Sequence, residues 1–344
     1  MNCLALARSA FTAHLARHKL SHYTGILSLQ GLERLARQHR DPADLARLRA
    51  ELAPFLAGER RFACNFPNYC VGGNGAAAAL CHGLLPEART AVAAEAEAFL
   101  KAPRERGGLV CMPKDPPAEK VWIDAAWAVT PFALHAGLAL DRADLIDEAC
   151  HQALGLYRLF RDPDNGLLHQ SRGFVGPGVL STDHWSRGNG WGLLALAALA
   201  EDLPTAHPRR AEARAAFADL IAACLRVQGP TGMWHQELPR HDSFVETSGS
   251  GIILHAIGVA LQLGLAPDGA RAALERGLQA YLGYIALDGS VFHTCVGCLS
   301  PGDGSPAAYM AHRHAKDDPH AFGPIILAFA QAAACGITTI GDPA

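Results

Sequence analysis

The chain has 344 residues, of which half are hydrophobic and only 18% are charged, with a formal net charge of −3. That length is long for one ordinary core and short for three, and the low charged fraction predicts that much of the backbone is buried between elements. The small negative charge and the lack of a long basic run argue against nucleic acid or an anionic membrane surface as a partner.

The beginning of the chain predicts neither a secretion signal nor a membrane anchor. Residues 1–8 have no basic leader before a sustained apolar run, and Arg17, His18 and Lys19 follow soon after. No apolar stretch is long and uninterrupted enough to span a bilayer. We therefore expect a cytoplasmic protein without a membrane partner.

One unit recurs along the chain: a glycine-containing loop, a helix that is apolar nearly all round, and then a more charged, amphipathic helix. The apolar helices are predicted to begin near Gly25, Gly75, Ala125, Gly190, Gly249 and Gly323. The amphipathic helices are predicted at 1–19, 41–57, 87–101, 141–160, 208–227 and 267–286. Helices that are apolar all round belong inside, and helices with a charged face belong outside.

Six inner and six outer helices predict an all-α (α/α)6 toroid that forms a single domain over residues 1–344. The inner helices of such a ring point their N-termini at one face, and helix N-termini attract anionic ligands. The alternative is an open α-solenoid that serves as a scaffold. The polar and aromatic loops cluster before the inner helices, on one side of the ring, which favours the toroid.

The loop before the third inner helix runs from Lys114 to Asp124 and contains Trp122. Asp124 stands where the apolar helix begins, so a helix-capping role is the simplest interpretation. A carboxyl group in an aromatic, partly desolvated site has a raised pKa, which suits proton transfer near neutral pH. The following turn, residues 162–170, presents His169, either as a hydrogen-bonded loop residue or as a functional one.

The fourth inner helix is preceded by Trp185-Ser186-Arg187-Gly188-Asn189-Gly190-Trp191. Indole faces suit a sugar ring or a cation, and the arginine fork matches a carboxylate. The glycines of this predicted loop are expected to let a ligand approach the main chain. The alternative is a glycine-rich loop that caps a buried helix, with the tryptophans as core residues.

The ten cysteines are scattered and stand in apolar surroundings, which is typical of buried reduced thiols. Cys295-Val-Gly-Cys298 is a single CxxC motif without a second one. A zinc or redox role is the less favoured interpretation of this motif.

Together these segments resemble the unsaturated glycuronyl hydrolases, specifically glycoside hydrolase family 105, with family 88 as near relatives. The resemblance extends over nearly the whole chain and implies an (α/α)6 barrel. It rests on residues 121–124 with Pro131 and Phe132, on 166–169 and on 185–191, and it is extended by 246–250 and 318–324.

The resemblance implies hydration of the C4–C5 double bond of the 4,5-unsaturated uronic acid that polysaccharide lyases leave at a non-reducing end. Asp124 would protonate C4 and take a proton from the water that attacks C5. The hemiketal would then open and release the next sugar. Rhamnogalacturonan fragments are the best-known substrates of this family.

The remaining site residues follow from the same resemblance. Arg187 would bind the uronate, with Lys114 as a further candidate, and His169 would hydrogen-bond ring substituents or the water. The sugar platform would consist of Trp122, Trp185 and Trp191. No metal or organic cofactor is implied, and the expected partner is the unsaturated oligosaccharide, bound by a monomer or homodimer.

One position departs from the family pattern. Family members carry an Asp in the loop before the second inner helix, and residues 68–75 here place Asn68 at that position, with Asn65 and Asn74 nearby. Asn cannot donate an acidic proton but can hydrogen-bond a hydroxyl group. We expect Asn68 to join Asp124 in the catalytic group by positioning substrate. The alternative is a slow, differently specific or inactive protein.

Two other classes of function fit parts of the sequence. Asn68 motivates a non-catalytic carbohydrate-binding toroid. The other class consists of further α-toroid enzymes, such as sugar epimerases or zinc-dependent proteins similar to lanthionine cyclases. Cys81-His82, together with Cys295 and Cys298, motivates the zinc-dependent alternative. A thiolate zinc site needs convergent ligands with supporting hydrogen bonds, whereas Cys81-His82 is predicted inside the second inner helix.

Overall fold

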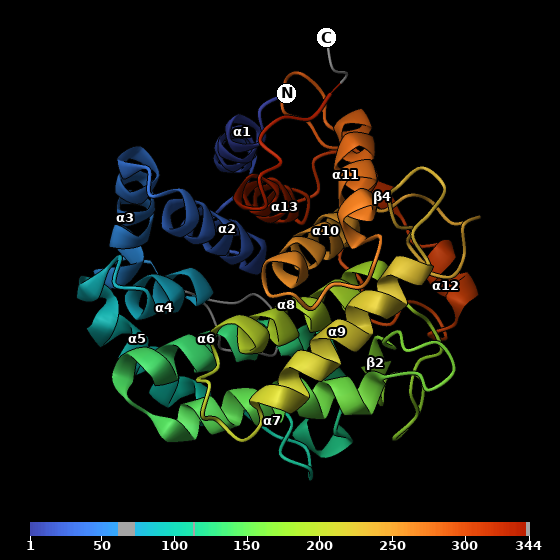
Figure 1. Ribbon diagram of the computed structural model, residues 1–344. Coiled ribbons are helices and arrows are strands. Elements are labelled where there is room, and N and C mark those ends of the chain that lie inside the picture. The colour runs from blue at the N-terminus through green and yellow to red at the C-terminus, as the bar shows by residue number, and fades with distance from the viewer. Residues whose placement is uncertain (61–72, 113, 342–344) are drawn as a thin grey trace.

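The computed structural model describes residues 1–60, 73–112 and 114–341. In these segments, two concentric sets of six helices make up most of the structure (Figure 1). The inner set is α2 (Tyr23–His39), α4 (Asn74–Cys81), α6 (Asp124–Leu140), α8 (Ser186–Asp202), α10 (Thr247–Gln262) and α13 (Phe322–Ala334). The outer set is α1 (Cys3–Arg17), α3 (Pro42–Leu56), α5 (Arg89–Phe99), α7 (Ala143–Phe160), α9 (Arg210–Arg226) and α11 (Ala270–Tyr281).

The inner helices form a closed ring. Each packs against the next in chain order, and α13 packs against both α2 and α1, which joins the last repeat to the first. The predicted (α/α)6 fold is therefore confirmed, and the open solenoid is wrong. Each of the six hairpins is stabilised by burying its apolar surface against both neighbours.

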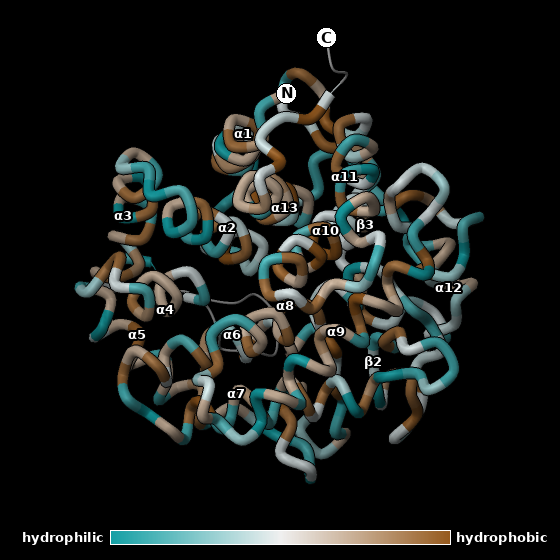
Figure 2. Tube along the Cα trace, in the orientation of Figure 1, coloured by the Kyte–Doolittle hydropathy of each residue, from teal (hydrophilic) through white to brown (hydrophobic). Residues whose placement is uncertain are grey.

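Hydropathy decides which helix of each hairpin lies inside. In α10 every residue from Thr247 to Ala260 is buried. By contrast, the buried residues of α7 recur every three or four positions, so this helix has one apolar face and one polar face. In Figure 2, α7 and α3 alternate between hydrophilic and hydrophobic colours, whereas α13 is almost free of hydrophilic colour.

Short strands tie together the loops that precede the inner helices. β1 (Val121–Trp122) pairs antiparallel with β2 (Ser171–Arg172), directly before α6. β3 (Thr294–Cys295) pairs antiparallel with β4 (His314–Ala315). The remaining short elements are α12 (Pro306–Met310) and the 3-10 turns Pro86–Ala88, Pro116–Ala118 and Leu282–Tyr284.

The two ends of the inner ring differ in chemistry. At the C-terminal ends of the helices, Arg34 pairs with Glu201 at 2.6 Å, and His135 Nε2 lies 2.8 Å from an Asp202 carboxylate oxygen. Ion pairs of this kind neutralise charge at that end. Asp124 and Arg187 lie at the other end, each in the first turn of its helix. In the described segments, every helix is too short or too polar to cross a membrane.

Candidate functional site

The N-terminal ends of the inner helices meet at one end of the ring. The Asn74 side chain, on the first residue of α4, donates to the Trp127 carbonyl in the first turn of α6 at 3.2 Å. Arg187 at the start of α8 donates to Ser248 Oγ at the start of α10 at 2.8 Å. Polar residues at the starts of neighbouring inner helices therefore lie side by side, as the toroid predicts.

Asp124 is the first residue of α6 and is only 2% exposed. The N-cap position belongs to Ile123, so the alternative role of Asp124 as a capping residue does not hold. Burial raises the pKa of Asp124 from 3.8 to about 7, although nearby Arg187 and the Gln170 and Trp191 side chains favour its charged form. The site therefore contains a carboxyl group that gains and loses a proton near neutral pH, as we expected from its aromatic surroundings.

A second buried carboxyl group, Asp183, lies beside Gln170. The Asp183 oxygens accept from the backbone N–H groups of Gln170 at 3.3 Å and Trp185 at 3.1 Å. Burial and, to a smaller extent, the nearby Glu237 charge raise the pKa of Asp183 to about 7. Sequence reasoning missed this residue, since Asp183 stands in a loop without a helical or strand pattern.

Gln170 connects this part of the site to the 298–309 segment. Its side-chain N–H donates to the Cys298 carbonyl at 2.8 Å. Its Oε1 accepts from the Ser300 backbone N–H at 2.6 Å and from the Tyr309 hydroxyl. A side chain bonded on both its donor and acceptor sides is fixed in place, which holds Gln170 beside Asp124.

The 185–191 segment is helical rather than a loop, because α8 begins at Ser186. Gly188 and Gly190 have ordinary helical backbone geometry, and a Cβ atom at Gly190 would lie 3.1 Å from the Ile252 side chain. The expectation that these glycines give a ligand access to the main chain is therefore wrong. They allow α10 and other buried elements to approach α8 closely.

Arg187 is 1% exposed and is bonded from several directions. Its guanidinium donates to the carbonyls of Cys295 at 2.8 Å and Val296 at 3.2 Å, in addition to Ser248. The nearest paired carboxylate oxygen, on Glu246, is 3.9 Å away. The charge of Arg187 is thus oriented by neutral groups and only loosely balanced by an acid.

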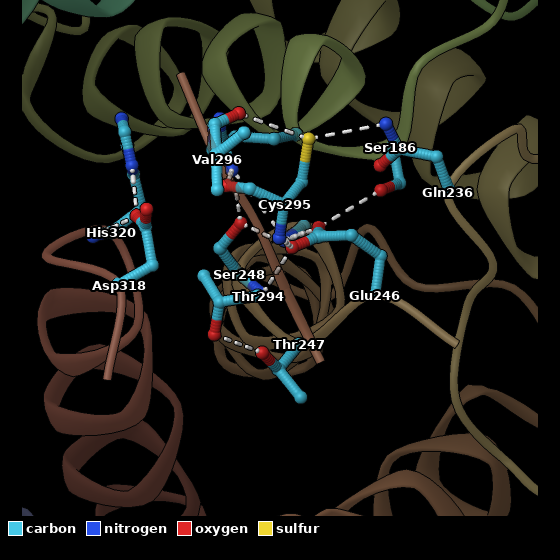
Figure 3. Close-up of polar contacts among 12 residues, drawn as sticks. Ser186, Gln236, Glu246, Thr247, Ser248, Thr294, Cys295, Val296, Asp318 and His320 are labelled. Atoms are coloured by element: carbon cyan, nitrogen blue, oxygen red, sulfur yellow. Dashed lines mark hydrogen bonds and ion pairs between the residues drawn. The ribbon is translucent and has the colours of Figure 1, made fainter. Parts of the chain in front are cut away.

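Glu246 organises the start of α10 beneath this arginine. Its buried carboxylate accepts from the backbone N–H groups of Ser248 at 3.0 Å and Gly249 at 2.6 Å, and from that of Cys295 at 3.0 Å. It also accepts from the Ser186 hydroxyl at 3.1 Å. Figure 3 shows Glu246 between Ser186 and Ser248, with the Cys295 main chain beside it. Three segments distant in the sequence are therefore joined through one carboxylate.

Several buried polar atoms near these helix starts lack a hydrogen-bond partner in the described residues. They are Asp124 Oδ2, Asn74 Oδ1, Trp185 Nε1 and Arg187 Nε. Buried polar groups are nearly always paired in folded proteins, so a group of unpaired ones indicates a place where a polar ligand binds. Their donors and acceptors together suit a ligand with both carboxylate and hydroxyl groups.

Comparison with known proteins agrees with this geometry. Residues 22–335 match the sequence profile of Glycosyl Hydrolase Family 88. The chain belongs to that family.

The chain is similar to two bacterial enzymes. The unsaturated rhamnogalacturonyl hydrolase YesR of Bacillus subtilis is 28% identical over 139 residues, which cover 40% of each chain. The unsaturated 3S-rhamnoglycuronyl hydrolase of Formosa agariphila is 28% identical over 154 residues, which cover 42% of this chain and 41% of that enzyme. The matches thus extend over less than half of either relative.

The fold is shared with a glycoside hydrolase of family 105 from Clostridium acetobutylicum, at a TM-score of 0.78 and 21% identity. That similarity covers 95% of this chain and 99% of the other. At this identity the comparison establishes the fold, and the chemistry has to be argued from the site.

The three predicted platform tryptophans are each 1% exposed. Trp122 stacks on Phe174 with ring centroids 4.7 Å apart, and Trp191 stacks on Trp127 at 4.8 Å. The Trp185 ring lies under the Arg187 guanidinium. This burial supports the alternative interpretation, in which the tryptophans are core residues. The buried indole rings keep water away from the polar groups of the site.

Two predicted residues lie at the periphery of the described site, and a third lies outside the described segments. His169 is half-buried, its Nδ1 lies 3.1 Å from the Asp183 carbonyl oxygen, and burial and His184 lower its pKa. Lys114 is exposed in the turn after Met112. Asn68 falls outside the described residues, so its position remains a prediction.

A Tyr–His–Asp chain adds residues that we did not assign from the sequence. The Tyr23 hydroxyl, on the first residue of α2, bonds to His320 Nε2, and His320 Nδ1 lies 2.5 Å from Asp318 Oδ1. Burial and the Arg187 charge lower the pKa of His320 to about 4, so the ring is neutral near neutral pH. The 318–324 motif was a usable signal, but only the fold brings it to Tyr23.

The zinc-enzyme alternative required Cys81 and His82 to meet Cys295 and Cys298. In the described segments these residues belong to separate groups of possible ligands. His82 lies with His135 and Asp202, whereas Cys295 and Cys298 lie with His312. The joint site that this alternative needs is therefore not formed.

Proposed function

We propose that this protein is an unsaturated glycuronyl hydrolase that hydrates the C4–C5 double bond of a non-reducing-end unsaturated uronic acid. The observation that carries the proposal is Asp124, a buried carboxyl group with a pKa near 7 beside a buried arginine. A carboxyl group with this pKa can donate a proton in one step and accept one in the next.

Proton transfer by Asp124 accounts for both halves of the reaction. The protonated carboxyl group donates its proton to C4 while water adds to C5. The resulting carboxylate takes one proton from that water, which restores Asp124 and leaves a hemiketal at C5. Opening of the hemiketal breaks the bond between C5 and the ring oxygen, which gives a C5 ketone and leaves a hemiacetal at C1. This hemiacetal collapses to an aldehyde by breaking the C1–O bond to the next sugar, which leaves as an alcohol.

Arg187 is the residue that we propose for binding the substrate carboxylate. Its Nε lacks a partner, and the nearest acidic oxygen is 3.9 Å away, so a uronate would supply the missing countercharge. The unpaired Trp185 indole N–H group would donate to a sugar hydroxyl or to the water. Asn68, His169 and Lys114 remain proposals for contacts to the rest of the oligosaccharide.

The substrate proposal is tested with disaccharides that polysaccharide lyases release from several polymers, rhamnogalacturonan among them. Hydration removes the conjugated double bond, so the ultraviolet absorbance of the unsaturated uronate disappears with time. In D2O, enzymatic protonation places one deuteron on a single face of C4, which NMR detects. If none of these disaccharides loses absorbance, or if deuterium enters both faces equally, the proposal is wrong.

A further inference from the structure

Two cysteines and a histidine converge beside the candidate site. The Sγ atoms of Cys295 and Cys298 and a ring nitrogen of His312 all lie within 4.8 Å of one another. Cys295 is fully buried and Cys298 is 3% exposed, while the half-buried His312 reaches the surface. The cluster therefore has a buried, sulfur-rich side and a side that solvent can reach.

The fold brings these three residues together through a strand pair. Cys295 in β3 pairs with His314 in β4, and the Val296 N–H donates to the Arg313 carbonyl at 3.1 Å. The CxxC turn then places Cys298 back beside Cys295. His312 precedes β4 by two residues, and its Nε2 lies 3.1 Å from the Gly297 carbonyl oxygen. This contact holds the imidazole against the turn, which is how ligating histidines are commonly oriented.

The sulfur of Cys295 lies between polar groups. The Gln236 side-chain N–H donates to Cys295 Sγ at 3.1 Å, and the Cys295 thiol donates to the Val296 carbonyl at 3.2 Å, as Figure 3 shows. When a metal displaces the thiol proton, the amide N–H can remain on the sulfur as a supporting hydrogen bond.

We propose that Cys295, Cys298 and His312 bind one thiophilic divalent ion of the Zn²⁺ class, with water as the fourth ligand. Two thiolates and one imidazole are a common zinc ligand set, and tetrahedral Zn²⁺ requires ligand atoms about 3.5–3.8 Å apart. Small side-chain movements would bring the three atoms to this spacing. Binding displaces the two thiol protons, so the ion and both thiolates together carry no net charge beside Arg187.

The ion would also fix the main chain that orients the candidate catalytic residues. The Cys295 and Val296 carbonyls accept from Arg187, and the Cys298 carbonyl accepts from Gln170. A metal that ties the turn to the strand before Ala315 would hold all three carbonyls. This inference does not rest on the proposed function, because metal binding is measured without a substrate.

The inference is tested by measuring metal content and by replacing the metal with Co²⁺. The full chain, purified under reducing conditions and saturated with Zn²⁺, should retain one equivalent after gel filtration. The Co²⁺ form should show the thiolate charge-transfer absorption and the strong visible bands of a tetrahedral sulfur site. Cys298→Ser and His312→Ala should each weaken Zn²⁺ binding by at least tenfold.

Two control variants locate the ion. Cys335→Ser changes a half-buried free cysteine elsewhere and should keep the full equivalent. His135→Ala disrupts one of the two other described groups of possible ligands, which consists of His82, His135 and Asp202, and it should also keep the equivalent. Loss of zinc in His135→Ala but not in Cys298→Ser would place the ion at the group that contains His135, and it would overturn the inference.

Two further results would overturn the proposal. The first is a protein that binds no Zn²⁺ or Co²⁺ although thiol titration finds both cysteines reduced. The second is a Cys295–Cys298 disulfide, detected by mass spectrometry, that forms as readily with Zn²⁺ present as without it. A bound ion protects thiolates from oxidation, so the proposal requires slower disulfide formation in the presence of Zn²⁺.

Discussion

The guanidinium of Arg187 lies over the indole ring of Trp185, with Cζ 4.4 Å from the ring centroid. The indole face attracts the cation, and the interaction is stronger where water is excluded, as it is for these two buried residues. Because both side chains are buried, solvent reaches neither the indole ring of Trp185 nor the flat face of the Arg187 guanidinium. Trp185 therefore holds the arginine in place, and a uronate would reach Arg187 through its edge at Nε.

Replacing Asp124 with Asn should abolish hydration while leaving the protein folded. Asn has nearly the same shape but no acidic proton, so we expect kcat to fall by at least ~100-fold. The loss of ultraviolet absorbance measures the rate, and circular dichroism checks the fold. Asp219→Asn, which changes a half-exposed carboxylate on the outer helix α9, serves as the control. Near-normal turnover by Asp124→Asn would exclude Asp124 as the proton donor.

The rate should depend on pH through the raised pKa of Asp124. Below about pH 7 the carboxyl group carries the proton that C4 needs, so kcat should fall as the pH rises through about 7. Arg187 favours the charged form of Asp124 and so lowers that pKa. Arg187→Gln should move the falling limb of the kcat profile to higher pH, and an unshifted limb would show that the two residues are uncoupled.

Buried carboxyl groups with raised pKa values also make stability depend on pH. Between 3.8 and about 7, the folded protein retains the protons on Asp124 and Asp183, whereas the unfolded chain has lost them. Stability should therefore decrease as pH rises through this range. Asp124→Asn should raise the free energy of unfolding by ~2 kcal/mol at pH 8 and by less at pH 5. Urea denaturation at the two pH values measures both numbers.

Arg187→Lys should weaken substrate binding more than it weakens the fold. Lysine retains the charge but lacks the planar fork that bonds Ser248 and two carbonyls at once, so KM should rise by about tenfold or more. Arg34→Lys is the matched control, because Arg34 is a buried arginine paired with Glu201 at the opposite end of the ring. It should lower the melting temperature without changing KM, and an equal KM effect would refute a specific role for Arg187.

Gly249→Ala should destabilise the protein and impair the site together. A Cβ atom there would lie 2.5 Å from Ser186 Oγ and 2.7 Å from the Arg187 backbone nitrogen, so α8 and α10 must separate. We expect a loss of ~2–3 kcal/mol in the free energy of unfolding and a rise in KM. Gly283→Ala adds the same methyl group where nothing lies within 4 Å and should change neither quantity measurably.

The sequence determined the architecture of this protein and the part of the site that lies at the helix starts. Six helices that are apolar all round, each followed by an amphipathic partner, can bury their surfaces only as a ring of hairpins, and the inner six helices begin close to the predicted residues. The position of Asp124 at the start of an inner helix, beside tryptophans, was enough to predict a raised pKa.

Only the tertiary structure decided how the loops complete the site. Asp183 and Gln170 lie in segments without helical or strand periodicity, and Tyr309 lies in the five-residue helix α12. They meet because the ring brings the helix starts together. The glycines near Arg187 suggested a ligand-binding loop, but they lie in helix α8. Close packing between inner helices requires small residues, and so does close approach of a ligand, so the sequence does not distinguish the two. The convergence of Cys295 and Cys298 with His312 likewise depends on the pairing of two-residue strands. Contacts between such short, distant segments leave no periodic signal in the sequence.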